Sequence, residues 1–175
     1  MMTPEKIRGN QFEIWLEEFL KLQGYKNVLR DVEYHKDKNT FRQADISYNY
    51  IVSKNHLKLM IVEAKYSSNG YISYKLRAGE KEKSGQVIRR IDNLVDEVWE
   101  RQNFIGADQS ILVTNKKFEN KVRTEAFKKG VKVLEGDDLQ LLFKKFGYLG
   151  TIDESISKID LRKHNLYKNV IYLDK

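Results

Sequence analysis

The stretch from Leu57 to Tyr66 reads LKLMIVEAKY, an apolar run that ends in charged residues. Successive side chains of a β-strand point to opposite faces, so a strand here places Glu63 and Lys65 on one face. The apolar residues before them predict a strand that is at least half buried. Because a buried charge without a partner is costly, we expect compensating groups beside Glu63 and Lys65.

The preceding stretch, Arg42 to Val52, supplies a second acid. It begins RQADISYNY, and period two places Asp45 on the side opposite Ala44 and Ile46. If the two strands are neighbours, Asp45 lies beside Glu63 on one face of the sheet. Adjacent carboxylates raise each other's pKa unless a cation lies between them, and such hard oxygen ligands suit Mg²⁺ or Mn²⁺. The two stretches therefore predict a divalent-metal site.

Each residue of this group has a role in phosphodiester hydrolysis. Asp45, Glu63 and the backbone carbonyl of Ala64 are expected to hold the metal, which activates a bound water and polarises the phosphate. Lys65 is expected to orient or deprotonate that water, or to stabilise charge in the transition state. The alternative is a surface ion pair between Glu63 and Lys65 on an edge strand. The apolar strand and the upstream Asp45 favour the catalytic interpretation.

Apolar periodicity predicts the elements around this site. An amphipathic helix is expected from Glu5 to Gln23, and Gly24 ends it. Short links between the strands that follow favour an antiparallel meander. Its strands are Val28 to Tyr34, Arg42 to Val52 and Leu57 to Tyr66.

The second half reads as alternating helices and strands, which implies a parallel strand pair joined by a crossover. The helices are expected at Gln86 to Asn103, at Glu119 to Lys129, and from an N-cap at Asp137 to near Gly147; the strands are expected at Ser110 to Thr114 and Val131 to Leu134. The more weakly patterned residues 150–175 are expected to form a C-terminal extension of a domain spanning residues 1–149. An edge strand or hairpin, an oligomerisation arm and a linker all remain open for it.

Composition narrows the class of protein. The chain of 175 residues suits one domain, and its lack of cysteine excludes disulfides and thiolate zinc sites. The sequence contains no apolar run of the roughly 18 residues that a membrane span needs, which favours a cytoplasmic protein. A net charge of +7 favours a polyanionic partner such as nucleic acid, although a basic surface also serves solubility.

Basic residues gather after the charged strand end. The polar stretch from Ser67 to Gly85 reads as a loop, and its cations are expected to contact phosphates without reading sequence, or only to be solvated. The loop cations are Lys75, Arg77, Lys81 and Lys83. On the expected helix that follows, Gln86, Arg89 and Arg90 share a polar side, which is either solvated or turned to nucleic acid.

The order of elements with Asp45 and IVEAK at 61–65 resembles the restriction-endonuclease-like, or PD-(D/E)XK, nuclease superfamily. Within it, the chain is most similar to Mrr-type restriction endonucleases and Holliday-junction resolvases. The resemblance covers Gly9 to Gly147, and the chain departs from the motif in having no proline before Asp45. It implies an α/β (α+β) fold with three layers, in which helices flank a central mixed sheet.

The resemblance also implies a function. It points to a Mg²⁺-dependent DNA endonuclease of restriction or of recombination and repair, and to a homodimer that pairs two active sites. Glu13 matches an acid that completes the metal shell in these relatives, whereas Glu17 is expected to point further towards solvent. Gln86 matches a glutamine that approaches the metal-bound water or the DNA. A non-catalytic nucleic-acid-binding or assembly module on the same fold, and an RNA-processing nuclease, are the alternatives.

Overall fold

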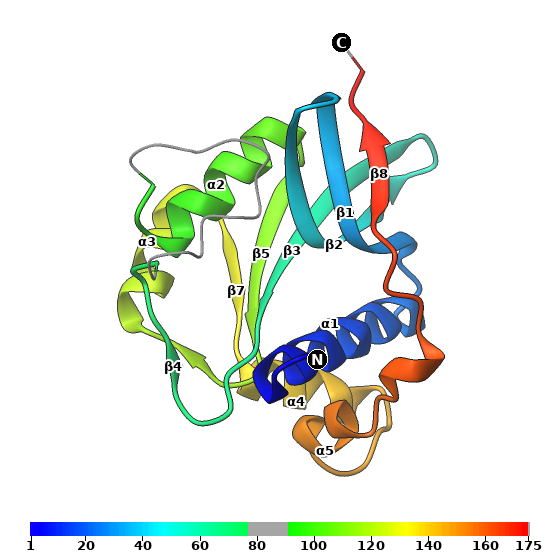
Figure 1. The fold of residues 1–175 in the computed structure, drawn as a ribbon, viewed down its shortest axis with the longest axis vertical. Coiled ribbons are helices and arrows are strands. Elements are labelled where there is room, and N and C mark those ends of the chain that lie inside the picture. The colour runs from blue at the N-terminus through cyan, green and yellow to red at the C-terminus, as the bar shows by residue number, and fades with distance from the viewer. Residues whose placement is uncertain (77–90, 175) are drawn as a thin grey trace.

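The structure, a computed structural model, describes residues 1–76 and 91–174. Within them, six strands form one mixed sheet in the order β7-β5-β3-β2-β1-β8, with helices on both faces (Figure 1). This is the three-layer α/β arrangement that the family resemblance implies. In chain order the elements are α1 (Pro4–Leu22), β1 (Lys26–Asp37), β2 (Thr40–Ser53), β3 (His56–Lys65), β4 (Tyr71–Ile72), α2 (Leu94–Ile105), β5 (Gln109–Thr114), β6 (Lys117–Phe118), α3 (Asn120–Lys129), β7 (Lys132–Leu134), α4 (Gly136–Lys145), α5 (Ile152–Ser157), a 3₁₀ turn (Leu161–Lys163) and β8 (Asn169–Tyr172).

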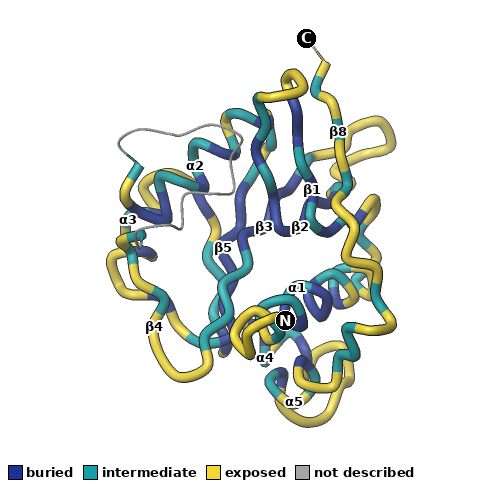
Figure 2. The backbone as a smooth tube through the Cα atoms, in the orientation of Figure 1, coloured by how far each residue is buried: buried dark blue, intermediate teal, exposed yellow. Residues whose placement is uncertain are grey.

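The sheet is built from an antiparallel and a parallel half that meet at β3. β1, β2 and β3 form the expected meander, and Ile46 of β2 lies opposite Val62 of β3. On its other side β3 pairs in parallel with β5, which pairs in parallel with β7. β3 therefore lies between two strands along its apolar length, which explains why its central residues are buried (Figure 2).

Apolar residues on the two faces of the sheet pack against different helices. On one face, Phe12 and Trp15 of α1 pack with Val62 and with residues of α4 and α5. On the other, α2 and α3 pack against Leu112 of β5 and Ile105 of α2 packs with Ile61 of β3. Val62 and Ile61 thus face opposite layers, and Glu63, two residues beyond Ile61, faces the α2 layer. None of the helices in residues 1–76 and 91–174 has the length and apolar character of a membrane span.

Helix α2 begins later than predicted. The expected start at Gln86 is wrong, because Asn93 has an extended backbone (φ −138°, ψ 156°) and is the N-cap of α2. Its side chain accepts a hydrogen bond of 2.8 Å from the Asp96 N–H, and the Leu94 N–H donates to the Tyr74 carbonyl at 2.8 Å. These bonds satisfy the first turn of the helix, so the apolar periodicity that continues upstream does not extend it.

Three further elements differ from expectation or resolve an alternative. The N-cap of α4 is Glu135 rather than Asp137, and it forms a capping box with Asp138. The C-terminal residues contain β8, which pairs in parallel with the outer edge of β1 (Figure 1). The loop that was expected to begin at Ser67 contains the short strand β4, which pairs in parallel with β6.

Candidate active site

Asp45 and Glu63 lie next to each other where the pairing of β2 with β3 ends. The β2–β3 register places Ile46 opposite Val62, so Asp45 and Glu63 are the next residues along. Both are buried, each with 2% of its surface exposed. The Ala64 N–H donates a hydrogen bond of 2.8 Å to Asp45 Oδ2, which fixes the Asp45 carboxylate against β3. Burial of two neighbouring carboxylates requires cations nearby.

The alternation of β2 is interrupted at Asp45. Ala44 packs with Ile61 on the α2 side, whereas Ile46 packs with Val62 on the α1 side. The expectation that Ala44 and Ile46 share a face is therefore wrong. Across from the interruption Asp31 of β1 has a positive φ of 52°, an uncommon conformation that alters the direction of a strand. β2 therefore changes face at Asp45, whose carboxylate accepts the hydrogen bond from the Ala64 N–H.

Among the described residues, Glu63 contacts Arg101, which sequence reasoning missed, as well as Lys65. Arg101 of α2 donates from Nη1 to Glu63 Oε2 at 2.5 Å, and Lys65 Nζ lies 3.5 Å from Glu63 Oε1. Arg101 is only 3% exposed, and its Nη2 also donates to Glu97 Oε1 at 3.1 Å. The only sequence signal was the spacing of Glu97 and Arg101 by four residues, which is typical of a surface ion pair.

Arg101 interacts electrostatically with three acids, Glu63, Glu97 and Asp45. Burial alone would lower the pKa of Arg101, but attraction to Glu63, Glu97 and Asp45 outweighs it and raises the pKa. Burial raises the pKa of Glu97, with Glu63 adding to the rise and Arg101 opposing it. Asp45, Glu63, Glu97 and Arg101 therefore form one charged group, which we call the buried acid cluster.

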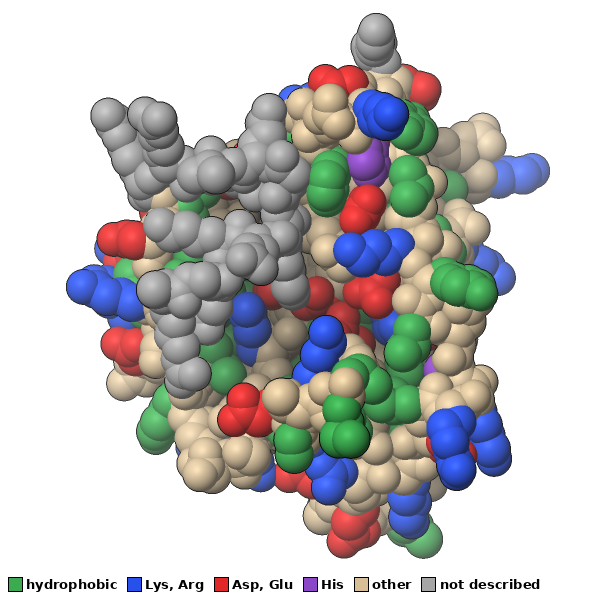
Figure 3. All heavy atoms as spheres, viewed as in Figure 1, with side chains coloured by type: hydrophobic (Ala, Val, Ile, Leu, Met, Phe, Trp, Pro, Cys, Tyr) green, Lys and Arg blue, Asp and Glu red, His purple; other side chains and the backbone are tan. Residues whose placement is uncertain are grey.

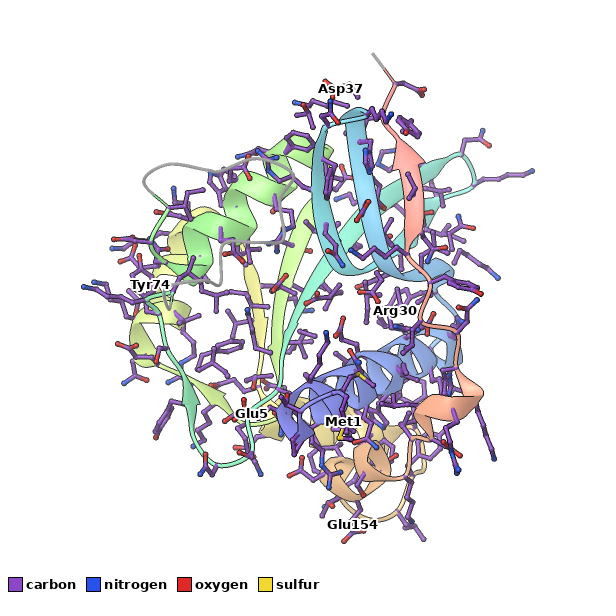
Figure 4. The ribbon with its side chains drawn as sticks, in the orientation of Figure 1. Met1, Glu5, Arg30, Asp37, Tyr74 and Glu154 are labelled. Carbon is purple, nitrogen blue, oxygen red and sulfur yellow. The ribbon has the colours of Figure 1, made fainter. Side chains whose placement is uncertain are left out.

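Lys65 connects the buried acid cluster to the surface. Its side chain is 23% exposed and lines a groove of about 720 Å³ together with Arg8, Tyr66 and Lys75. The groove runs along the first turns of α1, where Glu5 also lines it (Figure 4), and the surface is hollowed where blue and red side chains meet near the centre of Figure 3. An extended anionic chain in this groove would meet Lys65 at the strand end.

A second side chain missed from sequence holds the backbone just beyond Lys65. The Asn115 Oδ1 accepts a hydrogen bond of 2.8 Å from the Ser67 N–H, and its Nδ2 donates to the Ser67 carbonyl at 2.8 Å. Asn115 is buried and follows the last residue of β5, so it joins the ends of two parallel strands. Gly136 lies against it: a Cβ there would be 2.2 Å from the Asn115 carbonyl oxygen.

The structure places the remaining predicted site residues separately. Glu13 is half-buried on α1, between the fully buried Phe12 and Ile14. Glu17 is also half-buried, and its Oε1 accepts a hydrogen bond of 3.4 Å from the buried Arg30 Nε. Lys75 is exposed at the groove. Arg77, Lys81, Lys83, Gln86, Arg89 and Arg90 lie outside the described residues.

A divalent cation fits the chemistry of Asp45 and Glu63. The described residues contain no group of three or more His, Asp or Glu side chains arranged to hold a metal. Mg²⁺, however, retains several waters and needs only one or two carboxylates. A side-chain cation, the Arg101 guanidinium, already lies against these acids, and attraction to Glu63, Glu97 and Asp45 raises its pKa despite its burial.

Comparison with known proteins identifies the family. The family model described as "Restriction endonuclease" (Mrr_cat) matches residues 4–143, which include α1 and strands β1, β2, β3, β5 and β7. The chain belongs to this restriction-endonuclease family. No curated protein matches the chain. Among solved structures, this restriction-endonuclease-family chain is similar to the crystal structure of the protein of unknown function AF1548, with a TM-score of 0.56 and 13% identity over 88% of this chain and 72% of that one, a likeness of fold.

Proposed function

We propose that this member of the restriction-endonuclease family is a Mg²⁺-dependent endonuclease that hydrolyses DNA, with Mn²⁺ able to replace Mg²⁺. The observation that carries the proposal is the placement of the buried Asp45 beside the buried Glu63, at the point where β2 and β3 stop pairing. Lys65 lies next to Glu63 and lines an open groove. A binding module has no need for buried adjacent carboxylates, which cost free energy unless a cation accompanies them. The family match supports the same conclusion.

Each residue then has a defined role. Asp45, Glu63 and the Ala64 carbonyl hold the metal, which would polarise the scissile phosphate and lower the pKa of a bound water. Asp45 is kept in position by the Ala64 N–H. Lys65, on the face of Glu63 and partly exposed in the groove, is placed to contact a phosphate oxygen or the attacking water. By family resemblance, Glu13 completes the metal shell and Gln86 approaches the water or the DNA.

The groove gives the substrate a path to Lys65. Arg8 and Lys75 line it and can contact phosphates, and Tyr66 and Tyr71 offer ring faces for unstacked bases. Arg77, Lys81, Lys83, Arg89 and Arg90 extend the proposed phosphate contacts on the basis of sequence alone. A role in restriction or in recombination and repair, a cytoplasmic location and a homodimer that pairs two active sites belong to the same proposal.

One observation favours a second candidate. Arg101 lies 2.5 Å from Glu63 Oε2, an arrangement that also suits a module of this fold that binds nucleic acid without cutting it. An RNA-processing nuclease differs from the first candidate only in substrate. Cleavage assays separate the three.

The test is cleavage of supercoiled, linear, branched and single-stranded DNA, and of RNA, with Mg²⁺ or Mn²⁺. We expect Glu63→Gln and Lys65→Met each to reduce DNA cleavage by at least about 100-fold. Lys58→Met is the matched control, because Lys58 is exposed on the same strand and is expected to leave cleavage unchanged. Cleavage by both site variants at the wild-type rate would contradict the assignment. Binding of DNA by the wild type without cleavage of any substrate would favour the non-catalytic module.

A further inference from the structure

Both carboxylate oxygens of Glu63 face a side-chain cation. Oε2 accepts the 2.5 Å hydrogen bond from Arg101, and Oε1 lies 3.5 Å from Lys65 Nζ. These oxygens are the ones that the proposed metal would use. Hydrogen bonds between ionised partners are stronger than neutral ones, so a metal that binds either oxygen competes with a strong contact already present there.

Arg101 and Lys65 differ in how each side chain could move away from Glu63. Lys65 is partly exposed at the groove, so its ammonium can swing into water. Arg101, by contrast, is almost completely buried, with 3% of its surface exposed. Its Nε is also buried without a hydrogen-bond partner among the described residues, so the guanidinium is incompletely satisfied where it lies.

Glu97 gives Arg101 a second anchor. It lies one helical turn before Arg101, and Nη2 donates to it at 3.1 Å while Nη1 donates to Glu63. The guanidinium can therefore withdraw from Glu63 and keep its bond to Glu97. An arginine guanidinium is not deprotonated in proteins, so the positive charge stays within the buried acid cluster.

We propose that Arg101 is the internal counter-cation of the metal-free site, and that a divalent metal binds by displacing its guanidinium from Glu63 Oε2 towards Glu97. This inference rests on the proposed metal site at Asp45 and Glu63. Arg101 is a positioning residue: in the metal-free protein it holds the Glu63 carboxylate, and it limits how tightly the site binds metal. Without Arg101, Asp45, Glu63 and Glu97 would attract the metal with no internal competitor.

The test measures metal binding directly. Free Mn²⁺ is titrated by electron paramagnetic resonance against the full chain, wild type and Arg101→Gln, in the absence of nucleic acid. We expect Arg101→Gln to bind Mn²⁺ more tightly by on the order of tenfold or more, because one buried positive charge is removed next to the ligands. In the presence of EDTA, the same variant is expected to melt at a lower temperature than the wild type.

Two controls separate this role from general structural damage. Arg42→Gln removes another buried arginine that joins the sheet to α2, where it donates to Glu100 at 2.8 Å, and it is expected to lower stability while leaving Mn²⁺ affinity within about twofold. Adding Glu63→Gln to Arg101→Gln is expected to abolish the gain in affinity. If Arg101→Gln does not fold, Arg101→Lys, which keeps the charge but loses the two-sided fork, takes its place with a smaller gain expected.

The inference is overturned if the folded Arg101 variant binds Mn²⁺ no more tightly than the wild type, or if neither protein binds Mn²⁺. Failure of the proposed function is a different result. A tighter Mn²⁺ complex in the variant with no cleavage of any nucleic acid by the wild type would uphold the displacement of Arg101 from Glu63 and reject the nuclease.

Discussion

Gly136 allows a single methyl group to test the packing behind the candidate site. It is the first residue of α4, and an added Cβ would lie 2.2 Å from the carbonyl oxygen and 2.9 Å from the carbonyl carbon of Asn115. Both neighbours are backbone atoms, so no flexible side chain can move aside. We therefore expect Gly136→Ala to force α4 away from the end of β5.

The expected loss in the free energy of unfolding follows from the contacts that Gly136→Ala must change. The added methyl group overpacks this contact, and the shifts that relieve such an overlap cost about 1–3 kcal/mol. The Gly136 N–H also donates to the Lys116 carbonyl at 2.8 Å, and weakening such a bond costs about 0.5–1.5 kcal/mol. The higher helix propensity of alanine offsets only part of this loss, because Gly136 is the first residue of the helix. The expected loss is about 2–4 kcal/mol in the free energy of unfolding, which for a chain of 175 residues lowers Tm by about 5–15 °C.

The assay is urea unfolding monitored by tryptophan fluorescence, with a calorimetric melt of the same samples. Gly9→Ala is the matched control: Gly9 lies inside α1, an added Cβ there would meet nothing within 4 Å, and the change is expected to stabilise the protein by about 0.5–1 kcal/mol. The two identical substitutions thus have opposite expected signs. If Gly136→Ala changed the free energy of unfolding by less than about 0.5 kcal/mol, the close approach of α4 to Asn115 would be refuted.

Two further predictions concern the same scaffold. Asn115→Ala is expected to lower the free energy of unfolding by about 2 kcal/mol, because it removes both hydrogen bonds to Ser67. Asn115→Asp is expected to lower it further, because a buried carboxylate oxygen in place of Nδ2 would face the Ser67 carbonyl and Asp153 Oδ1; a smaller loss for Asn115→Asp than for Asn115→Ala in urea unfolding would contradict the two-bond clamp. Burial raises the pKa of Glu33, but hydrogen bonds from His35 and Lys168 outweigh it and leave the pKa below the usual 4.5. Because the depressed pKa belongs to the folded state, Glu33 contributes stability above pH 4.5 that is lost as the pH falls through the lowered pKa. Thermal melts from pH 6 to pH 3 are expected to show a smaller decline for Glu33→Gln than for the wild type, and parallel declines would reject the assignment.

The arrangement of the strands could be predicted because it depends on local patterns. Short links between apolar strands favour a meander, and period two places Glu63 and Lys65 on one face, where they lie 3.5 Å apart. Once the two strands are neighbours, their register brings Asp45 beside Glu63. These features require no knowledge of distant contacts.

The features that sequence reasoning missed depend on contacts between distant segments. Arg101 reads as a surface residue of an amphipathic helix, and only the packing of α2 on the sheet buries it against Glu63. The start of α2 at Leu94 depends on hydrogen bonding to residue 74, because the apolar period alone continues upstream. The change of face at Asp45 accompanies the positive φ of Asp31 on the neighbouring strand, which nothing in the sequence of β2 signals.

The pairing of β8 with β1 has a consequence for the order in which the chain folds. Arg30 donates to the Asn165 carbonyl, 135 residues away, and Asn169 donates to the Arg30 carbonyl across 139 residues (Figure 4 marks Arg30). Closing so long a loop has a high entropic cost, whereas the β1–β2–β3 meander closes through short turns. The meander can therefore act as the early folding unit, and β8 joins late and opens first. Amide protons of residues 169–172 are accordingly expected to exchange with solvent before those of β2 and β3, so the edge strand can detach while the strands that carry the acids remain folded.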